Sequence, residues 1–264
     1  MKVLGYLLLA VSCLFTASWQ LPQNPPAKEL GSRTYRFTTS YTYSNTKGEI
    51  ARRERITALC TWGPTGEVTW RDVSVSQANG KDAPFGPGEK REFMDNFRYR
   101  LANADDSLKP EFFKNFPPSA VAERNLVWDT LMFETFGRTE LEHLKLNEPY
   151  HFAPSQNIAL GGAGNFQNRD IELTWAGSSR RNGQDCALIL YQAFFNPLHI
   201  TVPGVDMIGR SHYWGSIWVS SATKQIEYAT LYEDVLGELK LPNQNTPQIV
   251  DVFRDGVFEP FQQK

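Results

Sequence analysis

The feature that most constrains the fold is an alternation of side chains near the N-terminus. From Tyr35 to Tyr43, every second residue is aromatic or a threonine, and arginine, serine or threonine residues stand between them. Side chains that repeat every two residues lie on one face of a β-strand. The pattern therefore predicts a strand with one aromatic face.

Short turns separate this strand from others like it. Turn residues at 45–48 and 63–66 flank a predicted strand at about 49–62, and another strand follows at 68–75. The second half repeats this organisation, with Asn182-Gly183, the commonest hairpin pair, at one turn. The strands predicted in that half lie at 170–175, 185–195, 213–219 and 225–232. Both halves are expected to be antiparallel meanders.

The segment between the two meanders has helical patterns. Residues 120–136 contain no Gly or Pro, with Ser119 available as N-cap and Gly137 as the stop, although a strand at 126–136 is the alternative. Phe93, Phe97 and Leu101 are spaced for one helical face, and a short helix is expected at 139–146. The predicted fold class is mainly β with helices (α+β), an antiparallel curved sheet or half-barrel with helices over one face.

The N-terminus is typical of an exported protein. Lys2, an uncharged run from Val3 to Trp19 and small residues near Ser18 predict a signal peptide at 1–18, a flexible linker at 19–32 and one β-rich domain at 33–264. A retained membrane anchor is the alternative; no later segment is long and apolar enough to span a bilayer. The expected location is periplasmic or extracellular. Lipidation at Cys13, within a lipobox-like sequence, is the alternative outcome and gives an outer-membrane lipoprotein.

The net charge argues against nucleic-acid binding, and the cysteine content allows one disulfide. Removing Lys2 with the signal leaves 26 basic and 29 acidic residues, or −3, which provides no electrostatic footprint for nucleic acid. The cysteines that remain, Cys60 and Cys186, can pair in an oxidising compartment, and two buried free thiols are the alternative.

No motif predicts catalysis, a metal or a cofactor. The glycine-rich loop at 161–165 has no Lys-Ser/Thr after it and fits no phosphate-binding pattern. Glu140 and His143 form a single Glu-x-x-His pair, whereas metal sites need several converging ligands. His151 and Asp170 suggest acid–base chemistry only by their nearness in sequence. We expect no catalytic residue, metal or cofactor, while an enzyme without a recognisable motif, such as a hydrolase, stays open.

The aromatic side chains of the first meander are the candidate ligand contacts. They either line a concave apolar groove or pack into a core. These six residues are Tyr35, Phe37, Tyr41, Tyr43, Trp62 and Trp70.

The order of meander, helical middle and closing hairpin around Gly215–Val219 and Lys224–Glu227 resembles half-barrel lipoprotein carriers of the LolA/LolB type. Residues 182–189 are similar to segments of uncharacterised secreted bacterial proteins of the acidobacterial kind. The resemblance is architectural and implies a carrier in which a curved sheet capped by helices holds acyl chains. We therefore expect a secreted or envelope module for an apolar ligand such as a lipid. The alternative is a structural or interaction protein of the cell envelope that binds an envelope protein.

Overall fold

A computed structural model describes residues 31–152, 158–241 and 246–262. The predicted signal peptide, Cys13 and the linker as far as residue 30 lie outside these ranges. Strands make up 58% of the structure and helical segments 16%. The strands are β1 (Arg33–Asn45), β2 (Ile50–Trp62), β3 (Glu67–Asn79), β4 (Glu89–Lys90), β5 (Arg98–Arg100), β6 (Pro149–Phe152), β7 (Ile158–Ala159), β8 (Gly164–Phe166), β9 (Ile171–Arg181), β10 (Gln184–Val202), β11 (Val205–Ser220), β12 (Ile226–Lys240) and β13 (Gln248–Pro260).

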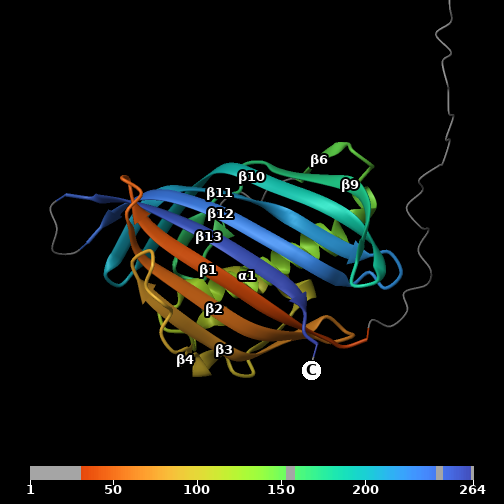
Figure 1. Ribbon diagram of the computed structural model, residues 1–264, viewed down its shortest axis with the longest axis horizontal. Helices are drawn as coiled ribbons and strands as arrows, with labels where there is room; N and C mark the ends of the chain where they lie inside the picture. The colour runs from red at the N-terminus through yellow and green to blue at the C-terminus, as the bar shows by residue number, and fades with distance from the viewer. Residues whose placement is uncertain (1–30, 153–157, 242–245, 263–264) are drawn as a thin grey trace, which may run out of the picture.

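All these strands belong to one open antiparallel sheet (Figure 1). Its main path runs β4-β3-β2-β1-β13-β12-β11-β10-β8-β7, and β9 lies beside β10 with β6 at its other side. The first strand, β1, therefore pairs with the last, β13, in an unbroken register from Tyr35 opposite Pro260 to Asn45 opposite Val250. This pairing joins the two meanders into one sheet.

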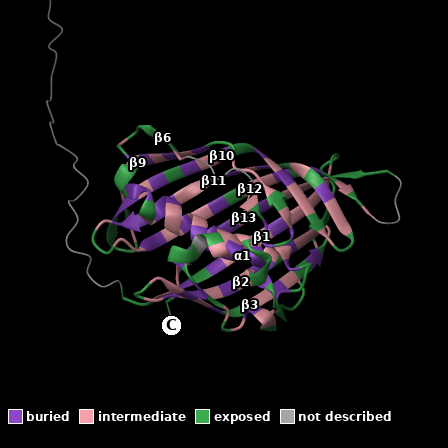
Figure 2. Cartoon of the chain, turned by 180° about the vertical axis from the view of Figure 1, so that it is seen from behind, coloured by how far each residue is buried: buried purple, intermediate pink, exposed green. Residues whose placement is uncertain are grey.

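The segment between β3 and β9 supplies the helical structure. Its single α-helix among the described residues, α1 (Val121–Glu134), lies against one side of the sheet, which Figure 2 shows from behind. We call the side that faces α1 the inner face and the opposite side the outer face. The shorter turns are the 3₁₀ segments η1 (Glu92–Met94), η2 (Leu101–Leu108), η3 (Pro110–Phe113) and η5 (Leu141–His143) and a π-turn, η4 (Thr135–Thr139). No helix within the described ranges is long and apolar enough to cross a membrane.

Aromatic side chains fill the space between α1 and the sheet. Phe37 of β1, Phe133 of α1 and Phe258 of β13 are fully buried, and their ring centroids lie 5.6–5.9 Å apart. Tyr35 stacks on Phe258 at 4.4 Å. Rings at these separations add to the free energy gained by burying apolar surface. The aromatic face predicted for the first strand is thus part of the main core.

The fold class predicted from the sequence was wrong. The predicted α+β fold, a curved antiparallel sheet or half-barrel with helices over one face, is replaced by a large open antiparallel sheet with one α-helix among the described residues. The predicted helical face around Phe93 and Phe97 consists instead of η1 and the short strand β5, because these rings pack in an aromatic cluster with Phe116 rather than along one helix. The helix predicted at 120–136 is confirmed, but its N-cap is Ala120 and not Ser119.

A buried ion pair joins α1 to the sheet. The Arg254 guanidinium, from the inner face of β13, donates to Asp129 of α1 and lies 3.0 Å from the Glu233 carboxylate of β12. Burial raises the pKa of Asp129 to about 6, although the positive charge of Arg254 acts in the opposite direction. Desolvation therefore outweighs the attraction between the charges at this position.

The core position of Phe37 makes a prediction about stability. Replacing Phe37 with Ala leaves a cavity and should lower the free energy of unfolding by about 3–5 kcal/mol. The control is Thr38→Ala on the outer face of the same strand, expected to cost less than about 0.5 kcal/mol. Urea denaturation measures both. Equal, small effects would show that the first strand's aromatic face does not pack in the core.

The raised pKa of Asp129 makes a prediction about pH. Since it exceeds the value of about 3.9 in an unfolded chain, this group's contribution to stability is fully present below about pH 4 and is lost as the pH rises through about 6. Asp129→Asn should remove this contribution, which is about 3 kcal/mol. Thermal unfolding from pH 4 to 7 checks it, with Asp185→Asn at the surface as control. Parallel pH profiles for Asp129→Asn and wild type would contradict the assignment.

Candidate functional site

A cavity of about 450 Å³ lies where the start of β1 meets the end of α1. Its apolar wall contains Tyr35, Trp62 and Leu101, and its polar wall contains arginine, glutamate, glutamine and threonine side chains. Ligand-binding clefts usually have volumes of about 300–1,000 Å³ and combine apolar walls with a few placed polar groups. This cavity has both properties.

The turn between β2 and β3 shapes the apolar wall. Gly66 has a φ of +76°, which a glycine adopts without strain, and its carbonyl accepts a 2.9 Å hydrogen bond from the Leu101 amide. This bond fixes the start of η2 beside the turn. Leu101 is thereby held opposite Trp62, and together they form one side of the cavity.

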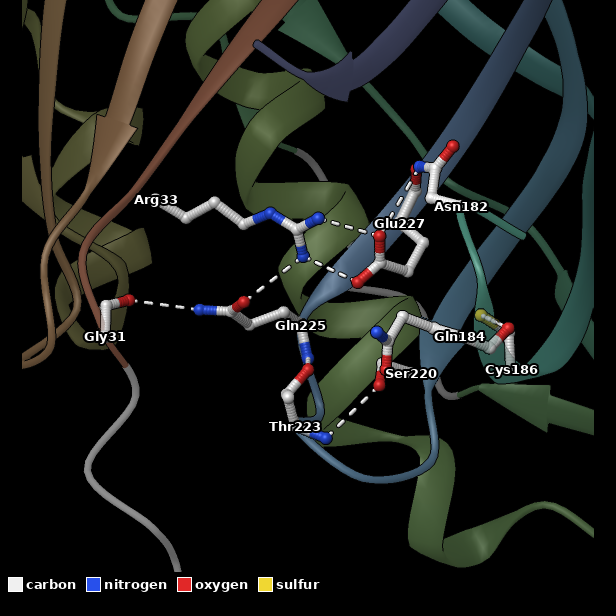
Figure 3. A network of polar contacts seen from close by, with 9 residues as sticks. All are labelled: Gly31, Arg33, Asn182, Gln184, Cys186, Ser220, Thr223, Gln225 and Glu227. Carbon is white, nitrogen blue, oxygen red and sulfur yellow. Dashed lines mark hydrogen bonds and ion pairs between the residues drawn. The ribbon is translucent and has the colours of Figure 1, made fainter. Parts of the chain in front are cut away.

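A network of polar contacts forms the second wall (Figure 3). The Arg33 guanidinium donates two hydrogen bonds of 2.7 Å to Glu227, whose carboxylate is buried, and a third of 3.2 Å to Gln225. Gln225 in turn donates to the carbonyl of Gly31 at 3.0 Å, and Asn182 donates to the Glu227 carbonyl. Bidentate arginine–carboxylate pairs are among the stronger hydrogen-bonded contacts. The network ties the start of β1 to the turn before β12.

The end of α1 supplies the third wall. Arg138 donates to Glu134 one turn earlier at 2.8 Å, and its Nε is buried with no hydrogen-bond partner. Burial raises the pKa of Glu134, while Arg138 lowers it. Gly137 lets the π-turn approach β11, since a Cβ there would lie 3.0 Å from the Ile217 side chain. The Arg138 side chain lines the cavity and is partly exposed, so its guanidinium is available to a ligand there.

The structure divides the six aromatic residues predicted to contact a ligand. Tyr35 and Trp62 line the cavity, and Trp62 also donates from Nε1 to the Cys60 sulfur at 3.1 Å. The other four do not line it. Phe37, Tyr41 and Trp70 are buried in the core, and Tyr43 packs against it partly exposed.

Sequence reasoning missed the charged residues of the site. Glu134 and Arg138 have the i, i+4 spacing of a helical ion pair, a signal that was available. No signal links Arg33 to Glu227, which lies 194 residues away. Their contact depends on the pairing of β1 with β13 and of β13 with β12.

The two described cysteines are free thiols and do not form the disulfide considered above. Cys60 lies on β2 and Cys186 on β10, and β1, β13, β12 and β11 separate these strands in the sheet. Desolvation raises the pKa of both thiols, which makes them poor nucleophiles.

The other polar groups considered in the sequence lie apart from the cavity. His143 contacts Glu140 at 3.1 Å, and His151 contacts Asp170 at 2.9 Å, with each histidine more than half exposed. The loop at 161–165 packs on Phe113 of η3. Over the described ranges, no three His, Cys, Asp or Glu side chains are grouped to hold a metal ion.

A second feature lies on the outer face, over β10 to β13. Large apolar side chains there are exposed to solvent between polar neighbours, and we call this surface the outer apolar patch. It consists of Leu190, Phe194, Phe195, Ile208, Trp214, Tyr232, Leu236, Ile249 and Phe253.

Comparison with known proteins gives a likeness at the level of fold. No protein-family model matches the chain, and no curated protein matches it. Among solved structures, the chain is similar to one of lipovitellin that describes lipid–protein interactions in that protein. The TM-score is 0.51 and the sequence identity is 12%. The match covers 90% of this chain and 26% of lipovitellin, so the chain spans about a quarter of that protein's length.

The cysteine geometry makes a prediction about thiol chemistry. In a Cys13→Ser variant, a thiol reagent should react slowly with the native protein and should titrate two thiols at once in denaturant, because both side chains are buried. Prior treatment with a reductant should leave the count unchanged. Thiols that appear only after reduction would reveal a disulfide instead.

Proposed function

We propose that the protein binds a lipid or a similar amphiphile, with the apolar part of the ligand in the cavity at the end of α1. The observation that carries the proposal is one cavity with an aromatic wall facing a wall that contains two arginines, Arg33 and Arg138. The fold similarity to lipovitellin, whose structure concerns lipid–protein interactions, supports the same ligand class.

The apolar wall provides affinity. Each methylene group removed from water contributes about 0.8 kcal/mol, and the flat rings of Tyr35 and Trp62 lose little conformational entropy when a chain lies on them. Since Phe37, Tyr41 and Trp70 fill the space between α1 and the sheet, a ligand occupies the end of that space and does not run along it.

The polar wall provides orientation. Arg138 lines the cavity with a side chain that is 23% exposed, and its guanidinium would donate a hydrogen bond to an oxygen of the ligand head group. The Arg33 guanidinium already donates hydrogen bonds to Glu227 and Gln225, so its role is to stabilise the wall. Arg138 is therefore the residue that would bind the head group. A carboxylate, phosphate or ester oxygen supplies the acceptor that this site needs.

Export is part of the proposal. The apolar run that ends at Trp19 supports a signal peptide, so the protein would bind its ligand in the periplasm or outside the cell. Lipidation at Cys13 would place the same carrier on a membrane. The second candidate, an interaction protein of the cell envelope, is favoured by the outer apolar patch.

A titration with a dansyl-labelled fatty acid tests the cavity. After solvent extraction of bound lipid, wild-type protein should bind the probe saturably, one per chain. Ala102→Trp places an indole in the cavity at an exposed position and should weaken binding at least tenfold. The matched control, Ala51→Trp, adds the same side chain at an exposed site on β2 and should bind like wild type. Thermal unfolding verifies that both variants fold.

Two results would overturn the proposal. One is the lack of saturable binding by wild type. The other is equal binding by Ala102→Trp and Ala51→Trp, which would place the probe outside the cavity.

A further inference from the structure

We propose that the outer apolar patch joins two copies of this chain in a symmetric homodimer, with the outer faces of β10 to β13 packed against each other. The proposal rests on the outer face alone, and so it is independent of the cavity and its ligand.

The patch is continuous across adjacent strands. Trp214 of β11 lies opposite Tyr232 of β12, and their rings stack at 5.9 Å. Tyr232 lies opposite Asp255 of β13, two residues from Phe253, so Phe253 is its diagonal neighbour on the same face. The apolar side chains therefore form a band that crosses the sheet, and they are not scattered singly.

An irregularity in β10 extends this band. The register between β10 and β11 shifts between Ala193 and Asn196, and Phe195 adopts a φ of 58° within that bulge. A phenylalanine rarely adopts this conformation, because its Cβ clashes with the backbone there. Phe194 and Phe195 are both exposed at the bulge, and both pack on the His212 ring. The strained backbone at Phe195 thus occurs where the bulge holds two large aromatic rings at the surface.

The apolar exposure is confined to this part of the molecule. All the large hydrophobic side chains that count as exposed in the described residues belong to β10, β11, β12 and β13. The outer face of β1 next to them is polar, with Arg36, Thr38 and Ser40 in alternating positions. A soluble protein rarely leaves such a concentration of apolar groups in water without a partner.

The area fits a second copy of the chain. The patch residues are 36–59% exposed. If each of these large side chains, aliphatic or aromatic, presents about 150–250 Å² when fully exposed, the nine residues offer together roughly 600–1,000 Å². A stable protein–protein interface needs about 800 Å² from each partner. The patch therefore provides one half of a standard interface.

The charges on the same face also favour a second copy. Asp234 and Asp251 stand beside the patch, and Arg210 and Lys240 lie on the outer faces of the same strands. A two-fold axis places the same surface on both sides, so acids of one copy can meet bases of the other. The acidic groups disfavour contact with an anionic membrane surface.

Sedimentation of the mature protein tests the interface. Wild type should sediment as a dimer at micromolar concentrations, and Tyr232→Lys/Phe253→Lys should be monomeric, because four lysines would then meet at the axis. In the monomer these lysines lie opposite Asp255 and Asp234, which favours correct folding. The control, Thr38→Lys/Ser40→Lys, adds the same charge to the outer face of β1 and should remain a dimer.

A second variant distinguishes loss of the dimer from misfolding. Phe195→Asn suits a positive φ and should fold well, yet it removes the most exposed ring and should weaken the dimer at least tenfold. A monomeric wild type would overturn the proposal. If that monomer also bound vesicles of neutral phosphatidylcholine, the patch would be assigned to a lipid surface. The proposal would also be contradicted if both patch variants formed dimers as tightly as wild type does.

Discussion

The pairing of the first strand with the last is the constraint on which the rest of the structure depends. β1 and β13 share eleven residue pairs, from Tyr35 with Pro260 to Asn45 with Val250. Without this ladder the chain would form two separate meanders, each with a long unprotected edge. With it, the inner face is continuous, α1 packs on rings from both halves, and Arg33 reaches the Glu227 carboxylate beyond β13.

The ladder also explains what could be predicted from the sequence. The alternation at 35–43, the turns at 45–48 and 63–66 and the helix near 120–136 are local patterns, and the structure confirms them. β13 was missed, because its inward positions include Gly256 and Arg254, which interrupt an apolar alternation. The fold class was wrong because most of the segment expected to form helices consists of short turns and strands, and α1 is the one α-helix among the described residues. At the cavity, Tyr35 and Trp62 belong to patterns visible in the sequence, whereas Arg33 and Glu227 meet only through long-range pairing.

The cavity and the outer apolar patch use different parts of one sheet. The cavity is formed by inner-face side chains and the end of α1, and none of its lining residues belongs to the patch. A dimer through the outer faces would therefore leave both cavities open to solvent. The proposed ligand site and the proposed dimer interface lie on opposite faces of the sheet, because successive side chains on each strand point to opposite faces.

We propose that the protein carries a lipid or similar amphiphile at the end of α1. The most direct measurement is native mass spectrometry of the protein purified gently from the cells that make it. The account predicts that each chain carries one additional mass, that solvent extraction removes it, and that the extract contains a lipid. A bare polypeptide mass, together with no uptake of added fatty acid or phospholipid, would contradict the account.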